Sequence, residues 1–418
     1  MKKILALVLA MAMMLCMFAG CGSSEASAAS AAESAAASAE EAAASAAEEA
    51  AAPAASTDFT WNGQKEVWSI LPTTGAEGLV MINDAMGAVM ESQGFVYDKK
   101  DAQGDPNAQV QFVEQAIAAG NVGCLMIAAM SVELLKDVVA QAVDAGIAVV
   151  YLGAEPTDYT IAGCVYTAYE ITGMYAVQAA EYWAQTSGAN VPTNADGKYE
   201  VAVDDYYGIA DGVYRSNAVV GTIEKSDSLV MVSETQAYGD GATTTAFENA
   251  QAVLNANPDC HIFVCYEPDE AIGIANAIAD YCDQNGTDVA DYCVIPCYGE
   301  DTTFTDLYNG ACEDPSTTAI KGYSTYGDPA MPVGDEAAAL YGPGYDALVE
   351  FAGADVLIPP VRTGAKLAEE LLGVCGIEGY SWEYGTTYYD TITAVTVDGF
   401  SATWSMGDEN PAAEYKHQ

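Results

Sequence analysis

Short runs of branched and aromatic residues alternate along this chain with longer segments whose apolar residues recur at helical spacing. Between residues 66 and 152 the pattern predicts strands at Glu66–Leu71, Phe95–Asp98, Cys124–Ala128 and Ile147–Leu152, and helices at Leu79–Gln93, Ala108–Ala119 and Val132–Ala145. A glycine follows each of these helices, at the position where a left-handed residue commonly ends a helix. Such alternation is typical of parallel βαβ units.

The same pattern begins again after residue 198. It predicts strands at Tyr199–Val203, Ser228–Val232, His261–Tyr266 and Tyr292–Cys297, and helices at Val213–Glu224, Ala242–Asn255 and Glu270–Gln284. We therefore expect an α/β fold with two doubly wound parallel-sheet lobes. Because open parallel sheets bind ligands beyond the carboxyl ends of their strands, function is expected in strand-to-helix loops that face one another across a cleft.

The sequence after residue 310 is expected to return to the lobes already formed. A strand is predicted at Ala319–Tyr326, helices at Asp335–Phe351 and Thr363–Leu372, and an exposed strand at Tyr388–Val397 that enters a hairpin turn. These returns imply about three crossings between the lobes, which would form a multi-strand hinge. We place the hinge near Thr167, Gly322 and Gly376.

Six segments summarise the expected organisation. They are a signal peptide at 1–20, a tether at 21–57, an N-terminal lobe at 58–167, a C-terminal lobe at 168–322, a return to the N-terminal lobe at 323–375, and a C-terminal lobe or tail at 376–418.

The N-terminus has the features of an export signal. Lys2 and Lys3 precede an apolar run, Ile4–Ala19, which is too short to cross a bilayer and ends in small residues before Cys21. The segment around Cys21 resembles the lipobox of bacterial lipoproteins, so this residue is the expected site of lipid attachment. An ordinary signal with an incidental cysteine is the alternative.

The tether from Gly22 to Thr57 consists almost wholly of Ala, Ser and Glu. Without aromatic or branched aliphatic residues it cannot bury a core, and as a coil it would span roughly 30 to 40 Å.

The formal net charge of the chain is −47 at pH 7. Nucleic acid and anionic lipid headgroups would be repelled by such a protein, so membrane association is expected only through the lipid anchor. The acidic surface is explained by solubility, with a preference for neutral or cationic ligands as a corollary.

Candidate metal and catalytic motifs are weak. Nine cysteines lie in the body of the chain without CxxC spacing, and only His261 and His417 are available as histidine ligands, so neither a metal site nor a cofactor is expected. The segment Gly322–Tyr326 fails the nucleophile-elbow pattern, and Gly239-Asp240-Gly241 lacks the third glycine and the lysine of a phosphate loop. We do not expect an enzyme.

Several motifs together resemble one family. These are Asp101–Gln109, Ile117–Gly120 and Ala145–Val150 in the first lobe, and Ala250–Pro258 and His261–Gly273 in the second. Their order and spacing are similar to those of type I periplasmic-type binding proteins, in particular the ribose-like sugar-binding group, over roughly Lys65 to Gly327. The resemblance implies a monomeric substrate-binding lipoprotein on the outer face of the cell membrane, which delivers a small solute, most often a sugar, to an ABC permease.

The resemblance also implies ligand-binding residues in the second lobe. Arg215 lies at the position where the family clamps the solute with an arginine, and its planar group donates five hydrogen bonds. Glu267 lies where the family has a ligand-binding Asn. The neighbouring Asp269 and Glu270 are favourable helix-start residues.

Elsewhere the chain departs from the sugar pattern. The loop Pro72–Glu77 replaces the family's stacking aromatics, so its candidates are Thr73, Thr74 and Glu77. Glu155 stands where an Asp-Arg pair commonly follows the fourth strand. Stacking is instead expected from tyrosines, for which the candidates are Tyr207, Tyr298 and Tyr326, with Tyr206 beside them.

Two alternatives remain open from the sequence. The same two-lobed protein would serve as a sensor that presents its bound solute to a receptor kinase, or as an importer component for a nucleoside, peptide or amine.

Overall fold

The computed structural model describes residues 59–416 except 76, 157–158, 240, 300–301, 327–337, 339–341 and 354–358. The expected signal, Cys21 and the tether lie outside the described residues, as does the side chain of Glu77.

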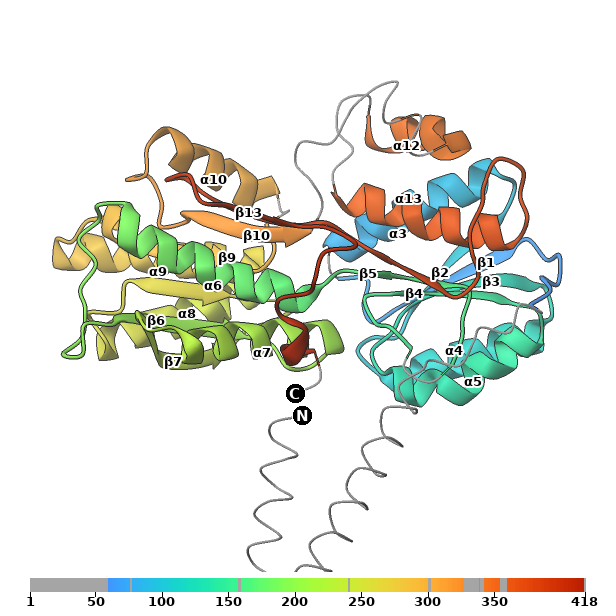
Figure 1. Cartoon of the computed structure of the whole chain (residues 1–418), viewed down its shortest axis with the longest axis horizontal. Coiled ribbons are helices and arrows are strands. Elements are labelled where there is room, and N and C mark those ends of the chain that lie inside the picture. The colour runs from blue at the N-terminus through green and yellow to red at the C-terminus, as the bar shows by residue number, and fades with distance from the viewer. Residues whose placement is uncertain are drawn as a thin grey trace, which may run out of the picture. The chain divides into compact units, whose positions relative to one another are not determined.

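The first lobe is built on a six-stranded parallel sheet (Figure 1). Its strands, in spatial order, are β11 (Thr386–Tyr389), β5 (Gly163–Tyr166), β4 (Ala148–Leu152), β3 (Val122–Ala128), β1 (Glu66–Leu71) and β2 (Val96–Asp101). Every residue of β3 and β4 is buried, as expected of central strands covered on both faces.

Helices cover both faces of this sheet. The helices on one face are α3 (Glu77–Ser92), α12 (Tyr345–Ala352) and α13 (Pro359–Val374), and those on the other are α4 (Pro106–Ala119) and α5 (Val132–Asp144). Local sequence sets the ends of α4, because the side chain of Asp105 accepts from Asn107 N and Gly120 ends the helix at a φ of 71°.

The second lobe contains a four-stranded parallel sheet in the order β7 (Leu229–Gln236), β6 (Tyr199–Asp205), β8 (Ile262–Cys265) and β9 (Cys293–Pro296). Side chains along β6 alternate between two apolar clusters. Val201 and Val203 pack with α6 (Tyr169–Thr186) and α7 (Ala210–Lys225), whereas Ala202 packs with α8 (Ala242–Ala256) and α9 (Pro268–Asn285). Helix α10 (Thr302–Glu313) lies on the same side as α9.

An antiparallel ribbon completes this lobe. It consists of β10 (Gly322–Tyr326), β12 (Ile392–Thr396) and β13 (Ser401–Trp404), and β10 and β12 pack against α6. Short 3-10 helices lie at Val289–Asp291, Gly342–Gly344 and Ala413–Tyr415.

The α/β fold with parallel sheets confirms the architecture predicted from the sequence, with several differences in its elements. Of the helix expected at Asp335–Phe351, most of the first part lies outside the described residues, and its last part is α12. Strand β5 and helices α6 and α10 are additional, and the strand expected at Tyr388–Val397 is two strands, β11 and β12, in different sheets. Helix α6 lacked a visible period because it is buried on most of its circumference, with apolar residues at Ile171, Met174, Ala176, Val177 and Trp183 among those enclosed.

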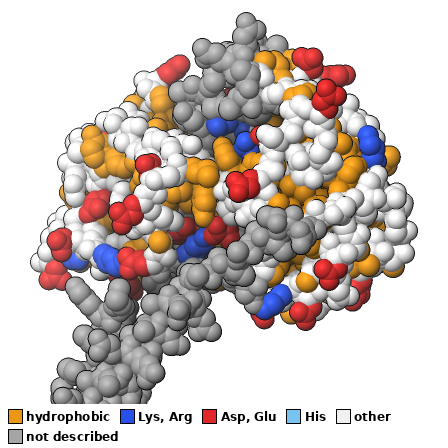
Figure 2. Space-filling model, turned by 45° about the vertical axis from the view of Figure 1, so that its right-hand side comes forward, with side chains coloured by type: hydrophobic (Ala, Val, Ile, Leu, Met, Phe, Trp, Pro, Cys, Tyr) orange, Lys and Arg blue, Asp and Glu red, His pale blue; other side chains and the backbone are white. Residues whose placement is uncertain are grey.

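Acidic side chains are spread over the surface of the described residues. Figure 2 shows them over several parts of one face, where Lys and Arg are fewer. This distribution matches the excess of 60 acidic over 13 basic residues in the whole chain. On the face shown in Figure 2 the acidic residues are therefore not confined to one cluster.

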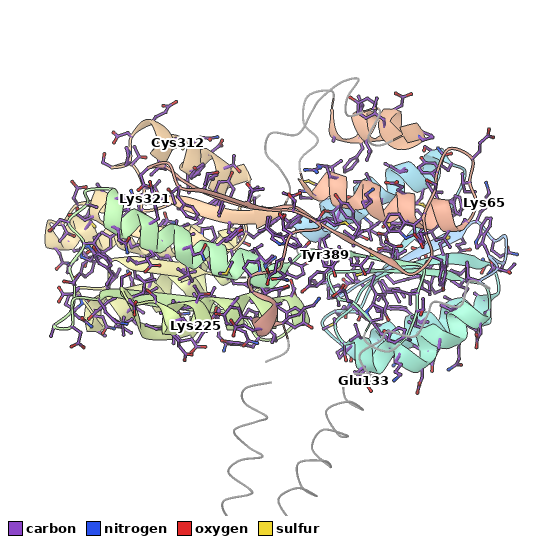
Figure 3. The ribbon with its side chains drawn as sticks, in the orientation of Figure 1. Lys65, Glu133, Lys225, Cys312, Lys321 and Tyr389 are labelled. Carbon is purple, nitrogen blue, oxygen red and sulfur yellow. The ribbon has the colours of Figure 1, made fainter. Side chains whose placement is uncertain are left out.

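The chain crosses between the lobes at three places. The first crossing is at Thr167, between β5 and α6; the second follows β10; the third lies just after Tyr389, which Figure 3 shows between the lobes. Of the expected hinge residues, Thr167 lies at a crossing, whereas Gly322 begins β10 in the second lobe and Gly376 follows α13 in the first.

A buried carboxylate connects two of these crossings. Asp390 is 5% exposed and accepts hydrogen bonds from Thr167 Oγ1 at 3.0 Å and from Thr363 Oγ1 of α13 at 3.2 Å. It therefore joins the first and third crossings to the first lobe.

The C-terminal tail also contacts both lobes. Lys225 of α7 donates to the Tyr415 hydroxyl at 2.8 Å, and Asn410 donates to Glu170 Oε1 at 2.7 Å. Lys416, the residue after Tyr415, pairs with Glu155, which follows β4 of the first lobe. The tail thus links the first lobe to the second beside the three crossings.

Replacing Gly364 with Ala should destabilise the first lobe. A Cβ at Gly364 would lie 2.2 Å from the Ile82 carbonyl oxygen of α3, so α13 and α3 would have to separate. We expect a loss of about 1 to 3 kcal/mol in the free energy of unfolding by chemical denaturation. Gly310→Ala in α10 is the matched control, because the nearest atom to its added Cβ is 3.8 Å away. Equal effects of the two changes would contradict the close packing of α13 on α3.

Replacing Asp390 with Asn should stabilise the protein in a pH-dependent way. Burial raises the pKa of Asp390 to about 6, although Thr167, Arg362 and Thr363 act to lower it. Between about pH 4 and pH 6 the unfolded state loses this proton and the folded state keeps it, so the carboxyl destabilises the fold increasingly as pH rises.

Denaturation at pH 7.5 should therefore show Asp390→Asn more stable than the parent by roughly 2 to 3 kcal/mol, and the difference should vanish near pH 4. Asp137→Asn, at an exposed position on α5, is the control. A difference that does not change with pH would contradict this account of the hinge.

Candidate ligand-binding cleft

A cleft of about 980 Å³ lies between the lobes. In the first lobe it is lined by the segments that follow β1, β3 and β4, among them Pro72–Gly75 and Ala128–Met130. In the second lobe the segments that follow β6, β7, β8 and β9 line it, among them Tyr266–Glu270. Much of the lining therefore comes from the carboxyl ends of parallel strands, where their topology favours a ligand site, and the rest includes residues of α3 and Tyr326 of β10.

The guanidinium of Arg215 is enclosed by aromatic rings. Arg215 lies on α7 and is 3% exposed, and its central carbon is 4.7 Å from the ring centre of Tyr169, 4.9 Å from that of Tyr266 and 5.9 Å from that of Tyr298. Cations at such distances from ring faces are stabilised by the ring quadrupole. The rings also restrict the guanidinium to one orientation.

Two nitrogens of this guanidinium have no hydrogen-bond partner among the described residues. They are Nε and Nη1; the second lies 3.8 Å from Glu267 Oε1, which is too long for a hydrogen bond. Burial lowers the pKa of Arg215, but Tyr266, Asp211 and Glu267 raise it more, so the group stays charged. Unpaired buried donors are costly, and a ligand oxygen would satisfy them.

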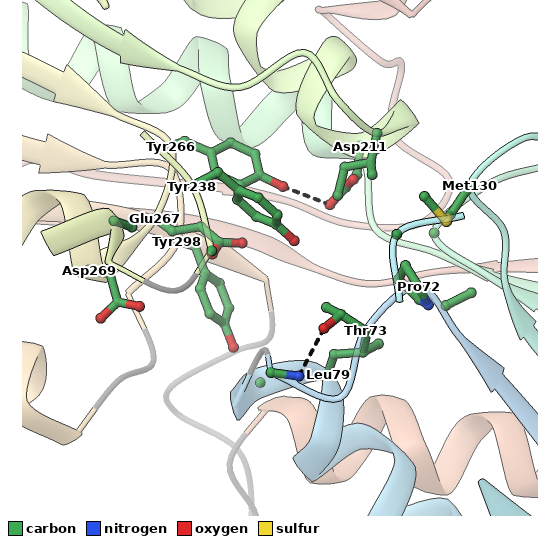
Figure 4. Close-up of a pocket in the computed structure, with 18 of the residues that line it drawn as sticks. Pro72, Thr73, Leu79, Met130, Asp211, Tyr238, Tyr266, Glu267, Asp269 and Tyr298 are labelled. Atoms are coloured by element: carbon green, nitrogen blue, oxygen red, sulfur yellow. Dashed lines mark hydrogen bonds between the residues drawn. The ribbon is translucent and has the colours of Figure 1, made fainter. Parts of the chain in front are cut away.

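Acidic side chains surround this single cation. The cleft is lined by Asp101, Asp211, Glu267, Asp269 and Glu270, against Arg215 as the one basic residue of its described lining. Asp211 accepts from the Tyr266 hydroxyl at 3.0 Å (Figure 4). Burial raises the pKa of both Glu267 and Glu270, so ionisation of these carboxyls is incompletely compensated.

Glu267 also begins helix α9. Its side chain lines the cleft, while its backbone N donates to Glu270 Oε2 at 3.0 Å. The Pro268-Asp269-Glu270 segment that follows places acidic residues in the first turn of the helix, where the dipole favours them.

Stacked tyrosines form the rest of the wall. Tyr238 stacks on Tyr206 with ring centres 3.9 Å apart, and Tyr298 stacks on Tyr326 at 5.2 Å. Figure 4 shows Tyr238, Tyr266 and Tyr298 on one side of the cleft, opposite Thr73 and Pro72. Each tyrosine offers an apolar face together with a hydroxyl, a combination suited to a ligand with both C–H and O–H groups.

A tyrosine also reaches across the cleft. A Cβ added to Gly78, in the first lobe, would lie 2.6 Å from the Tyr298 hydroxyl oxygen, so glycine leaves the space that this side chain of the second lobe occupies. The two walls are therefore already in contact at this point.

The chain matches a known protein family. A family model described as periplasmic binding protein domain matches residues 69–295, which is more than half of the chain. The chain belongs to this family. Its members are solute-binding proteins of transport systems and not enzymes.

Solved structures share the fold. The chain is similar to an ABC transporter solute-binding protein from Agrobacterium vitis with bound allitol (TM-score 0.56, 13% identity, covering 80% of this chain and 96% of that one). It is also similar to a carbohydrate transporter solute-binding protein from Agrobacterium radiobacter in complex with D-arabinose (TM-score 0.55, 15% identity, covering 84% and 98%). No match is found among curated proteins.

Six of the residues predicted for the site of this periplasmic binding protein line the cleft. They are Thr73, Thr74, Arg215, Glu267, Tyr298 and Tyr326. The Thr73 hydroxyl accepts from Gly75 N at 3.0 Å (Figure 4), and Thr74 donates to Asp101 Oδ2 at 2.8 Å.

Two predicted residues lie elsewhere. Glu155 accepts from the Tyr389 hydroxyl at 2.6 Å and pairs with Lys416, so it belongs to the contacts between the first lobe and the tail. The Tyr207 hydroxyl donates to Glu234 Oε1 at 3.1 Å on β7. Neither is part of the cleft lining.

Sequence reasoning missed Tyr169, Asp211 and Tyr238. Asp211 precedes Arg215 by four residues on α7 and so shares its helix face, but the helix predicted from the sequence began at Val213 and left Asp211 in the preceding loop. Tyr169 opens α6, the helix whose period was hidden by burial, and Tyr238 directly follows β7.

Among the described residues, no helix combines the length and the apolar character needed to span a bilayer.

Proposed function

We propose that this protein is the extracellular solute-binding lipoprotein of an ABC importer, and that it encloses a small polar solute, a sugar first of all, between its lobes. The observation that carries the proposal is Arg215, which lines the cleft, is enclosed by tyrosine rings, and has two buried nitrogens without a hydrogen-bond partner among the described residues. The sugars and polyols bound by similar proteins support it, including the D-allose in one from Actinobacillus succinogenes 130z (TM-score 0.55, 12% identity, covering 82% of this chain and 98% of that one).

Binding follows from this arrangement. Hydroxyl oxygens of the solute accept from Arg215, whose planar group donates in fixed directions, while tyrosine rings cover the C–H face of the sugar. Closure at the three crossings brings Thr73 and Thr74 of the first lobe toward the same solute and excludes water. The protein acts as a monomer, and an ABC permease recognises its closed form.

The first test is a ligand screen on the purified mature protein. Sugars, polyols, nucleosides, amino acids and amines are compared by thermal shift, and each hit is measured by calorimetry. A hundredfold excess over Kd should stabilise the folded state by about 2.7 kcal/mol. We expect stabilisation by sugars or polyols; stabilisation by nucleosides or amino acids alone would contradict the sugar assignment.

Arg215→Met should weaken binding of any sugar found in this screen by about a hundredfold, because the solute loses its charged donors. Lys99→Met is the control, since Lys99 lies at an exposed position on β2 and does not line the cleft. Calorimetry on both variants should give near-parental affinity for the control alone. Equal loss in both, or none in either, would remove Arg215 from the site.

Membrane attachment is proposed to depend on Cys21, at the end of the expected signal. Cys21→Ser should move the protein from the membrane fraction to the medium, because the acyl chains have no thiol to attach to. Fractionation and intact-mass measurement of the parent and the variant provide the test. If the parent were also soluble and carried no lipid mass, the signal would be an ordinary one.

A further inference from the structure

The cleft is lined by more acidic than basic residues. Five carboxylic acids line it, and its one described cation, Arg215, is already opposed by Glu267 at 3.8 Å. Tyr169 and Tyr266 cover the guanidinium further. Arg215 thus provides hydrogen-bond donors inside an acidic site, but its positive charge does not make the site attractive to anions.

A solute with its own carboxylate or phosphate would enter this acidic surrounding at a disadvantage. Any position within reach of Arg215 is also near Glu267 and Asp211, because both flank the guanidinium. Like charges at close range in a partly buried site repel strongly. The charge distribution therefore works against acidic sugars.

A solute with a protonated amine would be attracted to the acidic residues of the cleft. Figure 4 shows the carboxylates of Glu267 and Asp211 on the same side of the cleft as the tyrosine hydroxyls. Glu267 is half-buried, and burial raises its pKa even though Arg215 acts to lower it, so Arg215 alone only partly stabilises the ionised form of this carboxyl. An ammonium group on the ligand would supply the missing positive charge through a charge-assisted hydrogen bond.

We propose that the cleft selects carbohydrates by charge: it binds amino sugars with a protonated amine more tightly than the matching neutral sugars, and it rejects uronic acids and sugar phosphates. Glu267 is the specificity-determining residue that receives the amine. This inference rests on the proposed sugar-binding function and adds to it the class of sugar that the site prefers.

Matched ligand series test the proposal. Each series keeps one ring stereochemistry and changes one group, as in D-glucose, D-glucosamine and D-glucuronate, with the galactose and mannose series beside it. Calorimetry on the mature protein at low salt should show the amine about tenfold tighter than the neutral member of the series that fits best. The uronate should bind at least tenfold more weakly than the neutral sugar.

Two further measurements separate charge recognition from shape. Glu267→Gln should bring the amine-to-neutral affinity ratio close to one, whereas Glu133→Gln, on α5 in Figure 3 and not part of the cleft lining, should leave that ratio unchanged. In the parent protein the ratio should fall as NaCl is raised, because salt screens the pair. The salt series needs no variant, so poor folding of Glu267→Gln would not obscure the result.

The possible results separate sugar binding from selection by charge. If neutral sugars bind and uronates or sugar phosphates bind as tightly, or amines bind no more tightly, selection by charge is overturned while sugar binding stands. If no member of any series binds and the screen of other sugars and polyols is also negative, the proposed function is overturned and the charge preference with it.

Discussion

The cleft depends on one buried guanidinium that its surroundings hold in place without using up its donors. Arg215 keeps its charge because Tyr266, Asp211 and Glu267 favour the protonated form, and it keeps its position because tyrosine rings pack on it. Two of its nitrogens have no hydrogen-bond partner in the described part of the chain. A group that is charged, rigid and unsatisfied is pre-organised for a polar ligand, because little is lost in ordering it when the ligand arrives.

Strand topology explains why this group lies between the lobes. In both sheets the strands are parallel, so all their carboxyl ends lie at one edge, and the loops beyond these edges form the two walls. The chain then returns twice, through β11 to the first sheet and through β12 to the ribbon of the second lobe. Asp390 lies between these two strands and binds Thr167 of the first crossing, so the hinge is a connected unit and not separate linkers.

Much of this architecture was predictable because local signals agree with the tertiary fold. Val201 and Val203 alternate with Ala202 as a strand buried on both faces requires, and Gly120 ends its helix in the left-handed conformation. Burial hid α6, since a helix enclosed on most sides has no polar stripe to reveal its period. The strand expected at Tyr388–Val397 kept its alternation across a change of sheet, which no local pattern marks.

The cleft itself was only partly predictable, and contacts distant in sequence explain the rest. Glu155 was expected at the ligand from its position after β4, but Lys416, 261 residues away, pairs with it instead. At the end of β6, neighbouring side chains separate: Tyr206 stacks on Tyr238 of the cleft wall, whereas Tyr207 bonds to Glu234. The direction of each side chain at the strand end determines which of the two tyrosines contacts the cleft wall, and the composition of the segment does not reveal it.

Several carboxyl groups of this protein are buried at positions where they reduce its stability. Burial raises the pKa of Asp205 to about 7 and that of Asp390 to about 6, and it raises the pKa of Glu267 as well, so each of these groups reduces stability when ionised. These acids lie at the end of β6, at the hinge and at the cleft wall. Such local conflicts between stability and composition are expected where a site needs charge for a ligand or for movement. The acidic cleft wall thus connects the acidic composition of this chain with the charge preference that we propose for its solute.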